Sequence, residues 1–146
     1  MLKRYCRYQA AIVRDDQILL IQHREEAGRV YWVIPGGGIE GDETEPACVA
    51  REALEETNLV VEVVDLLLDE PHAGTVYERT KTYLCRVISG EASPGHEPEF
   101  EQGGPYAIAG VGWFDLARPE SWDPLVAEDR WTWPLMDRIR IALGYA

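Results

Sequence analysis

The sequence predicts an α/β fold in which helices cover both faces of a mixed β-sheet, within one domain that spans residues 1–146. Short β-rich runs bounded by turn residues fill most of the chain, whereas residues 44–57 and 134–145 repeat apolar side chains at helical spacing. The order of these segments is typical of a sheet packed between helices. The length of 146 residues lies close to the commonest size of a single domain.

The first strands form a predicted hairpin. The run "YQAAIVRDDQILLIQHR" has one β-rich segment that ends at Val13, a turn at Asp15 and Asp16, and a return segment that begins at Ile18. The next apolar run, "YWVIPGGG", reads as a short strand that stops at Pro35 and opens into three glycines. The chain therefore reaches its first helix through a glycine-rich turn.

The first predicted helix follows this turn and covers residues 44–57. Asp42 or Thr44 can cap its N-terminus, and Asn58 can close its C-terminus in a left-handed conformation. Apolar residues recur along this segment at helical spacing. The face expected to pack on the sheet consists of Ala47, Ala50 and Leu54.

The second half of the chain is predicted to hold three more strands and a last helix. "LVVEVVDLLL" reads as a mostly buried strand, "TVYERTKTYLCRVI" as a second strand and "VGWFD" as a third. Residues 89–106 are rich in Gly, Pro and Glu and form a long irregular loop, and loops of this length in compact domains are often functional. The last helix begins near Pro134, and its apolar face is expected to hold Leu135, Ile139, Ala142 and Leu143.

Composition restricts the class of partner and the compartment. The net charge of −12, without a basic stripe, argues against a nucleic-acid polymer, because such binding depends on clustered Lys and Arg. No run is long enough to cross a bilayer and the first residues do not resemble a signal peptide, so no membrane partner is expected. Cys6, Cys48 and Cys85 are widely spaced in apolar runs, which indicates buried, reduced thiols. A cytoplasmic protein is predicted.

Three glutamates in "REALEETN" crowd one side of the first predicted helix. Residues three and four apart on a helix are neighbours, so Glu52, Glu55 and Glu56 share a face and repel one another. Hard divalent cations prefer such oxygen ligands, and Mg²⁺ typically combines a few carboxylates with waters and substrate phosphates. On these three residues alone, a solvated acidic helix face is the more common explanation. The flanking residues favour a metal site instead.

The segment that carries these glutamates reads "GGIEGDETEPACVAREALEETNL" from Gly37 to Leu59. It resembles the Nudix box, G-x5-E-x7-R-E-U-x-E-E-x-G-U, in which U is aliphatic. Asn58 departs from the motif, because it stands where the family usually has glycine. Asparagine is the next best residue for a left-handed helix end, so the helix can still end there. The fixed glycine and polar positions are matched by Gly37, Glu43, Arg51, Glu52, Glu55 and Glu56, and aliphatic positions by Ala53 and Leu59.

The resemblance implies the Nudix fold, an α/β/α sandwich around a mixed sheet, and a metal-dependent hydrolase. In this family the box binds Mg²⁺ or Mn²⁺, and the diphosphate linkage of a nucleoside diphosphate bearing a further group is hydrolysed. The partner is then a small nucleotide, and the protein is expected to be a monomer or a homodimer. Glu43 and Arg51 are implied to pair and to hold the loop against the helix. The implied metal ligands are the backbone carbonyl of Gly37 and the side chains of Glu52, Glu55 and Glu56, which are also the implied catalytic residues.

The long loop is expected to add one carboxylate to the site. In many Nudix relatives a glutamate after the fifth or sixth strand completes the metal shell or acts as general base. Glu97, Glu99 and Glu101 are the candidates in this chain, and Glu99 is preferred because the neighbouring Phe100 could anchor it. The alternative is that all three are solvated.

Few residues of the sequence indicate which class of nucleotide is the substrate. Arg24 and Lys81 are candidates for contacts with phosphates, although solvated surface side chains would look the same. Tyr77 lies 18 residues beyond Leu59, near the spacing of a tyrosine that marks relatives acting on dinucleoside polyphosphates, whereas Pro71 comes too early for the proline that marks ADP-ribose hydrolases. Dinucleoside polyphosphates are therefore expected ahead of nucleoside triphosphates and ADP-ribose-type sugar nucleotides. A catalytically weak Nudix module that senses nucleotides is the alternative.

Overall fold

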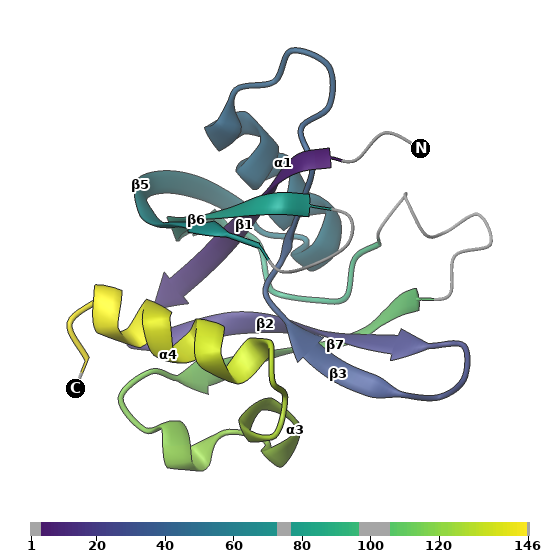
Figure 1. Ribbon diagram of the computed structural model, residues 1–146, viewed down its shortest axis with the longest axis vertical. Helices are drawn as coiled ribbons and strands as arrows, with labels where there is room; N and C mark the ends of the chain where they lie inside the picture. The colour runs from purple at the N-terminus through teal and green to yellow at the C-terminus, as the bar shows by residue number, and fades with distance from the viewer. Residues whose placement is uncertain (1–3, 73–76, 97–105, 146) are drawn as a thin grey trace.

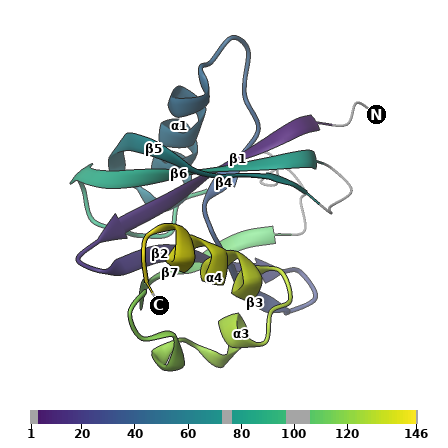
Figure 2. The ribbon, with the colours of Figure 1, turned by 60° about the vertical axis from the view of Figure 1, so that its left-hand side comes forward.

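The computed structural model describes residues 4–72, 77–96 and 106–145, and it has a mixed β-sheet with helices on both faces (Figures 1 and 2). The strand order is β3-β2-β1-β6-β5, with β4 paired to β1 and β7 paired to β2. β1 and β6 run parallel, whereas the other described pairs are antiparallel. The predicted fold class is therefore confirmed. The strands are β1 (Arg4–Arg14), β2 (Gln17–Glu25), β3 (Val30–Val33), β4 (Gly36–Gly37), β5 (Val60–Pro71), β6 (Tyr77–Ser89) and β7 (Tyr106–Asp115).

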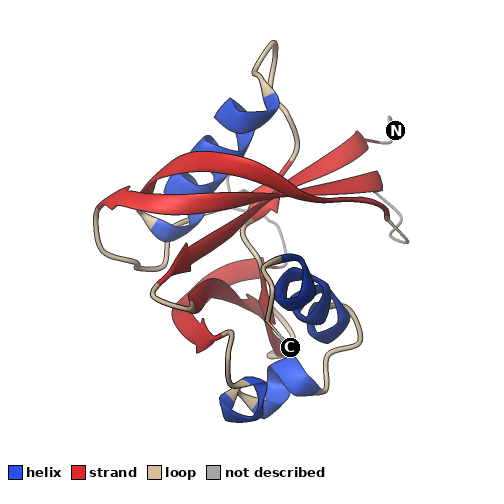
Figure 3. Ribbon diagram, turned by 90° about the vertical axis from the view of Figure 1, so that its left-hand side faces the viewer, coloured by secondary structure: helices blue, strands red, loops and turns tan. Residues whose placement is uncertain are grey.

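The first two strands form the predicted hairpin. Asp15 and Asp16 turn the chain with φ values of 50° and 65°. Left-handed conformations at both central positions match the twist of the flanking strands, and Asp tolerates them. β1 and β2 pair only next to this turn and then diverge, so that β1 continues beside β4 and β6 while β2 continues beside β3 and β7 (Figure 3).

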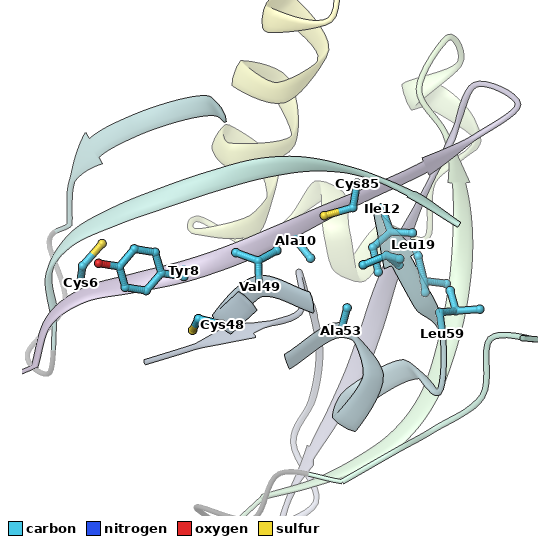
Figure 4. Packing of buried hydrophobic residues seen from close by; sticks show 11 residues of the cluster. Cys6, Tyr8, Ala10, Ile12, Leu19, Cys48, Val49, Ala53, Leu59 and Cys85 are labelled. Carbon is cyan, nitrogen blue, oxygen red and sulfur yellow. The ribbon is translucent and has the colours of Figure 1, made fainter. Parts of the chain in front are cut away.

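Helix α1 (Glu45–Thr57) lies on one side of β1 and β6, and α4 (Thr132–Ala142) lies on the other side together with α3 (Pro124–Ala127) and the short 3₁₀ helix η1 (Pro119–Ser121) (Figures 1 and 3). Alternate side chains of β1 fill the two cores. Ala10 and Ile12 face α1 (Figure 4). Ala11 packs in the core on the α4 side. β1 thus contributes side chains to the cores under both helices.

Both ends of α1 follow the sequence prediction, but its packing face does not. Thr44 is the N-cap, with its Oγ1 accepting a hydrogen bond from Ala47 N at 3.2 Å, and Asn58 ends the helix in the left-handed region at φ 62°. Ala47 and Leu54 are exposed, and Ala50 is only half-buried. The predicted face is wrong because two charged residues, Glu52 and Glu56, lie on the buried face of the helix. The buried residues are Cys48, Val49, Glu52, Ala53, Glu56 and Thr57.

Two further expectations are corrected. β5 was expected to be mostly buried, but it is the edge strand of the sheet and exposes Val60, Val64 and Leu66. The last helix begins at Thr132, two residues before Pro134, and it buries Met136 and Arg140 while Ala142 is exposed. Arg140 can be buried because its Nε donates to Leu116 O at 2.7 Å.

The three cysteines are free and buried, as expected. Burial raises the pKa of Cys48 and of Cys85 to about 12. In the part of the chain that the structure describes, no helix has both the length and the apolar character needed to cross a membrane.

Candidate active site

The glycine-rich turn lies directly against α1. Gly36 and Gly37 pair with Gln9 and Tyr8 of β1, and Gly36 N donates to Glu56 Oε1 at 3.2 Å. A Cβ on Gly37 would lie 2.4 Å from Glu52 Oε1. Any larger residue at position 37 would therefore require the Glu52 carboxylate or the turn to shift.

A side chain that sequence reasoning missed holds the same turn from the other strand. Arg7 of β1 donates from Nη1 to Gly36 O at 3.1 Å and from Nη2 to Ile34 O at 3.0 Å, while its Nε donates to Gln9 Oε1 at 3.1 Å. A single arginine in a β-rich run gives no local signal for these contacts, because its partners lie 27 and 29 residues away.

Arg51 joins the loop before α1 to the helix. Its Nε lies 2.7 Å from Glu43 Oε2 and its Nη2 lies 3.0 Å from Glu43 Oε1, a two-point pair. Nη2 also donates to Gly38 O at 3.0 Å. The hydrogen bond from Arg51 lowers the pKa of Glu43, and the same contact raises the pKa of Arg51. The implied pairing of Glu43 and Arg51 is thus present.

The three glutamates lie around Arg51 and the glycine turn. Glu52 and Glu56 are buried, with 4% and 1% of their surface exposed, and the Glu55 side chain is 22% exposed. Arg51 Nη1 lies 3.0 Å from Glu52 Oε1 and 3.2 Å from Glu55 Oε2. The alternative of a solvated acidic face does not hold for Glu52 and Glu56, because helix carboxylates are almost never buried without a specific partner.

The donors fit a hard divalent cation in their chemistry. Glu52 touches the backbone at Gly37, and Glu56 accepts from Gly36, so carboxylate oxygens from α1 meet the turn whose carbonyl was predicted as a ligand. Across residues 4–72, 77–96 and 106–145, no group of three or more His, Cys, Asp or Glu side chains is already gathered around one point. The carboxylates of Glu52 and Glu55 instead form ion pairs with the Arg51 guanidinium.

The remaining predicted site residues lie in different places. Lys81 Nζ pairs with Glu45 Oε2 at 3.1 Å, and Tyr83 donates to the same carboxylate. Glu45 begins α1 seven residues before Glu52, roughly two turns or 10 Å along the axis, so Lys81 is held at the opposite end of the helix from Glu56. Tyr77 packs edge-on to His72, with ring centroids 6.1 Å apart, and Arg24 is exposed on β2. The candidate loop residues Glu97, Glu99 and Glu101 lie outside the described residues.

Comparisons with known proteins show the family to which the chain belongs. The family model for the Nudix domain matches residues 5–133. The NAD-capped RNA hydrolase NudC of Photobacterium profundum is 37% identical over 87 residues, which are 60% of this chain and 32% of that protein. The chain spans about a third or less of the first curated relatives that it matches.

Solved structures match over almost the whole chain. A MutT Nudix hydrolase from Burkholderia pseudomallei is 30% identical with a TM-score of 0.67, over 94% of this chain and 98% of that one. An ADP-ribose pyrophosphatase from Streptococcus suis is 25% identical with a TM-score of 0.67, over 95% of this chain and 91% of that one. Both resemble this chain in fold as well as in sequence.

Proposed function

The chain belongs to the Nudix family of hydrolases, and we propose that it cleaves the diphosphate linkage of a nucleoside diphosphate joined to a further group. The observation that carries the proposal is the burial of Glu52 and Glu56 against Gly36 and Gly37. Carboxylate oxygens are the ligands that a hard divalent cation prefers. A site that holds several of them at a backbone turn is therefore suited to a cation.

Nudix hydrolases use divalent metal ions, and we propose Mg²⁺ or Mn²⁺ for this one. Such an ion would supply positive charge opposite the phosphates and would activate a water near neutral pH. The residues that would hold it are the carbonyl of Gly37 and the side chains of Glu52, Glu55 and Glu56. Because the ion brings local positive charge, a chain with a net charge of −12 can still bind an anionic substrate.

The other residues of the site position these donors. Glu43 fixes Arg51 by two hydrogen bonds, and Arg51 in turn contacts the carboxylates of Glu52 and Glu55. Arg7 donates to the carbonyl oxygens of Ile34 and Gly36, so the turn is fixed from β1 as well as from α1. Glu99 is proposed to add one further carboxylate to the site.

The substrate class follows from shared chemistry. Relatives are named for NAD-capped RNA and for ADP-ribose, which both contain a diphosphate attached to adenosine. We propose the same linkage for this protein and keep dinucleoside polyphosphates as the first candidate, on the position of Tyr77. ADP-ribose is the second candidate, favoured by the likeness to the Streptococcus suis structure. Lys81 is engaged with Glu45, so Arg24, which is exposed on β2, is the more accessible candidate for a contact with phosphates.

A substrate panel tests the proposal. Diadenosine polyphosphates, ADP-ribose, NAD, NAD-capped RNA and nucleoside triphosphates are each incubated with the protein and Mg²⁺ or Mn²⁺, and the products are identified by mass. We expect metal-dependent release of a nucleoside monophosphate from one class. Turnover of ADP-ribose with diadenosine polyphosphates untouched would remove the argument from Tyr77. Tight nucleotide binding without turnover of any compound would favour a sensor module.

We also propose that residues 1–146 act as one Nudix domain, supported by the family match and by two cores that share β1. The three buried free thiols support a reducing compartment such as the cytoplasm. Size-exclusion chromatography with light scattering distinguishes a monomer from a homodimer.

A further inference from the structure

The C-terminal end of α1 is closed by a segment that comes 35 residues later. A helix normally leaves its last four carbonyls without an intrahelical partner. In this protein Ser93 N donates to Thr57 O at 3.0 Å, Gly95 N to Glu56 O at 2.9 Å and His96 N to Glu55 O at 2.8 Å. Residues 90–96, hereafter the strap, therefore bond to the same turn that carries two of the glutamates.

Asn58 fastens the strap to the helix end. Its Nδ2 lies 2.8 Å from Ser93 Oγ and 3.3 Å from both Ser93 O and Pro94 O. The residue also takes the left-handed conformation that ends the helix, at φ 62°. Glycine, the usual residue of the Nudix box at this position, would take the same backbone conformation but would supply none of these hydrogen bonds.

Close packing of the strap requires glycine at position 95. A Cβ there would lie 1.8 Å from Glu55 O, which is far inside any tolerated contact with a rigid backbone atom. The strap and the last turn of α1 are therefore in backbone-to-backbone contact.

We propose that Asn58, Ser93 and Gly95 are positioning residues that fix the last helical turn and so hold Glu55 and Glu56 in place for a divalent cation. The inference rests on the proposed function, because it assigns these glutamates to a metal. Helix ends fray more readily than helix interiors, and ligand positions must hold to within about 0.5 Å. The substitution of glycine by asparagine in the box then adds a clamp at the point where fraying would move the ligands.

The test measures metal binding without substrate. The dissociation constant for Mn²⁺ is determined by electron paramagnetic resonance for the wild type, Asn58→Gly, Ser93→Ala and the double variant. The matched control is Asp15→Gly, which also replaces a residue at a left-handed φ, in the hairpin between β1 and β2. Amide hydrogen exchange at Gly95 and His96 reports whether their hydrogen bonds to the last turn of α1 are formed.

We expect Asn58→Gly to raise the Mn²⁺ dissociation constant about tenfold, the typical effect of removing a residue that orients a ligand. Exchange at Gly95 and His96 should accelerate in the same variant, and Asp15→Gly should change neither quantity. Because the Ser93 hydroxyl meets the helix end through Asn58 Nδ2, the double variant should behave like Asn58→Gly alone. Gly95→Ala, which displaces the strap as a whole, should raise the constant at least as much.

The proposal is overturned if Asn58→Gly and Gly95→Ala both accelerate exchange in the strap while their Mn²⁺ dissociation constants stay within twofold of the wild type. It is also overturned if Asp15→Gly weakens Mn²⁺ binding as much as Asn58→Gly does. A wild-type protein that neither binds Mn²⁺ nor hydrolyses any nucleotide would instead contradict the proposed function, so the two failures are distinguishable.

Discussion

Arg51 and Glu43 form a two-point ion pair, at 2.7 Å and 3.0 Å, between the middle of α1 and the loop that leads into it. Because the same guanidinium also contacts Gly38 O and Glu52, the pair ties together the loop, the glycine turn and one of the glutamates. The pair therefore joins the loop to the helix at the point where the glutamates lie.

Arg51→Lys is expected to reduce kcat/KM by about 10–100-fold, because lysine keeps the charge but loses the fork that binds Glu43 and Gly38 together. Initial rates and thermal melting measure the effect. Arg86→Lys is the matched control, since Arg86 pairs with Glu62 on the surface with side chains 64% and 53% exposed. Equal effects of the two substitutions would show that Arg51 contributes no more than a surface pair.

Acid unfolding should depend on Glu43. Arg51 lowers the pKa of Glu43 from its ordinary value of 4.5, so the unfolded chain takes up a proton at a higher pH than the folded protein does. The stabilisation is complete above about pH 4.5 and is lost as the pH falls toward the folded-state pKa. Urea unfolding at pH 6.0, 4.5 and 3.5 should show the wild type losing its advantage over Glu43→Gln. A constant difference across this range would rule out the linkage.

Glu56→Gln should abolish most of the activity while the fold is kept. Gln retains an oxygen that can accept the hydrogen bond from Gly36 N, so the melting temperature should hold or rise as repulsion among the carboxylates is relieved. Activity should fall more than about 100-fold, beyond the loss typical of residues that only orient a ligand. Near-normal turnover in both Glu52→Gln and Glu56→Gln would contradict the metal assignment. Glu62→Gln, at an exposed position of β5, is the control.

Local signals predicted the parts of the fold that depend on neighbouring residues. The turn at Asp15 and Asp16, the Thr44 cap and the left-handed Asn58 are all present. The predicted packing face of α1 was wrong. Glu52 and Glu56 lie on the buried face, whereas hydrophobic periodicity assigns glutamate to the surface. Exceptions of this kind to the hydrophobic pattern are expected at functional sites.

Other features depend on contacts between distant segments. β5 exposes apolar side chains and lies at the edge of the sheet. Its run of apolar residues does not indicate its place in the strand order. The contacts of Arg7 with the glycine turn and of Asn58 with the strap join segments about 30 residues apart. The spacing of the Nudix box indicates the candidate glutamates, but it does not indicate Arg7 or the residues of the strap that contact their surroundings.

Gly37→Ala tests the close approach of the glycine turn to α1. The added Cβ would lie 2.4 Å from Glu52 Oε1, so either the buried carboxylate or the turn must shift. Overpacking of this kind costs about 1–3 kcal/mol of stability, and the displaced Glu52 should lower activity at least tenfold. Gly110→Ala is the matched control, because on β7 the nearest atom to its Cβ would be 3.9 Å away. Its stability should stay within about 0.5 kcal/mol of the wild type. If Gly37→Ala kept full activity and unchanged Mn²⁺ affinity, the backbone at Gly37 and the Glu52 carboxylate would not share one cation.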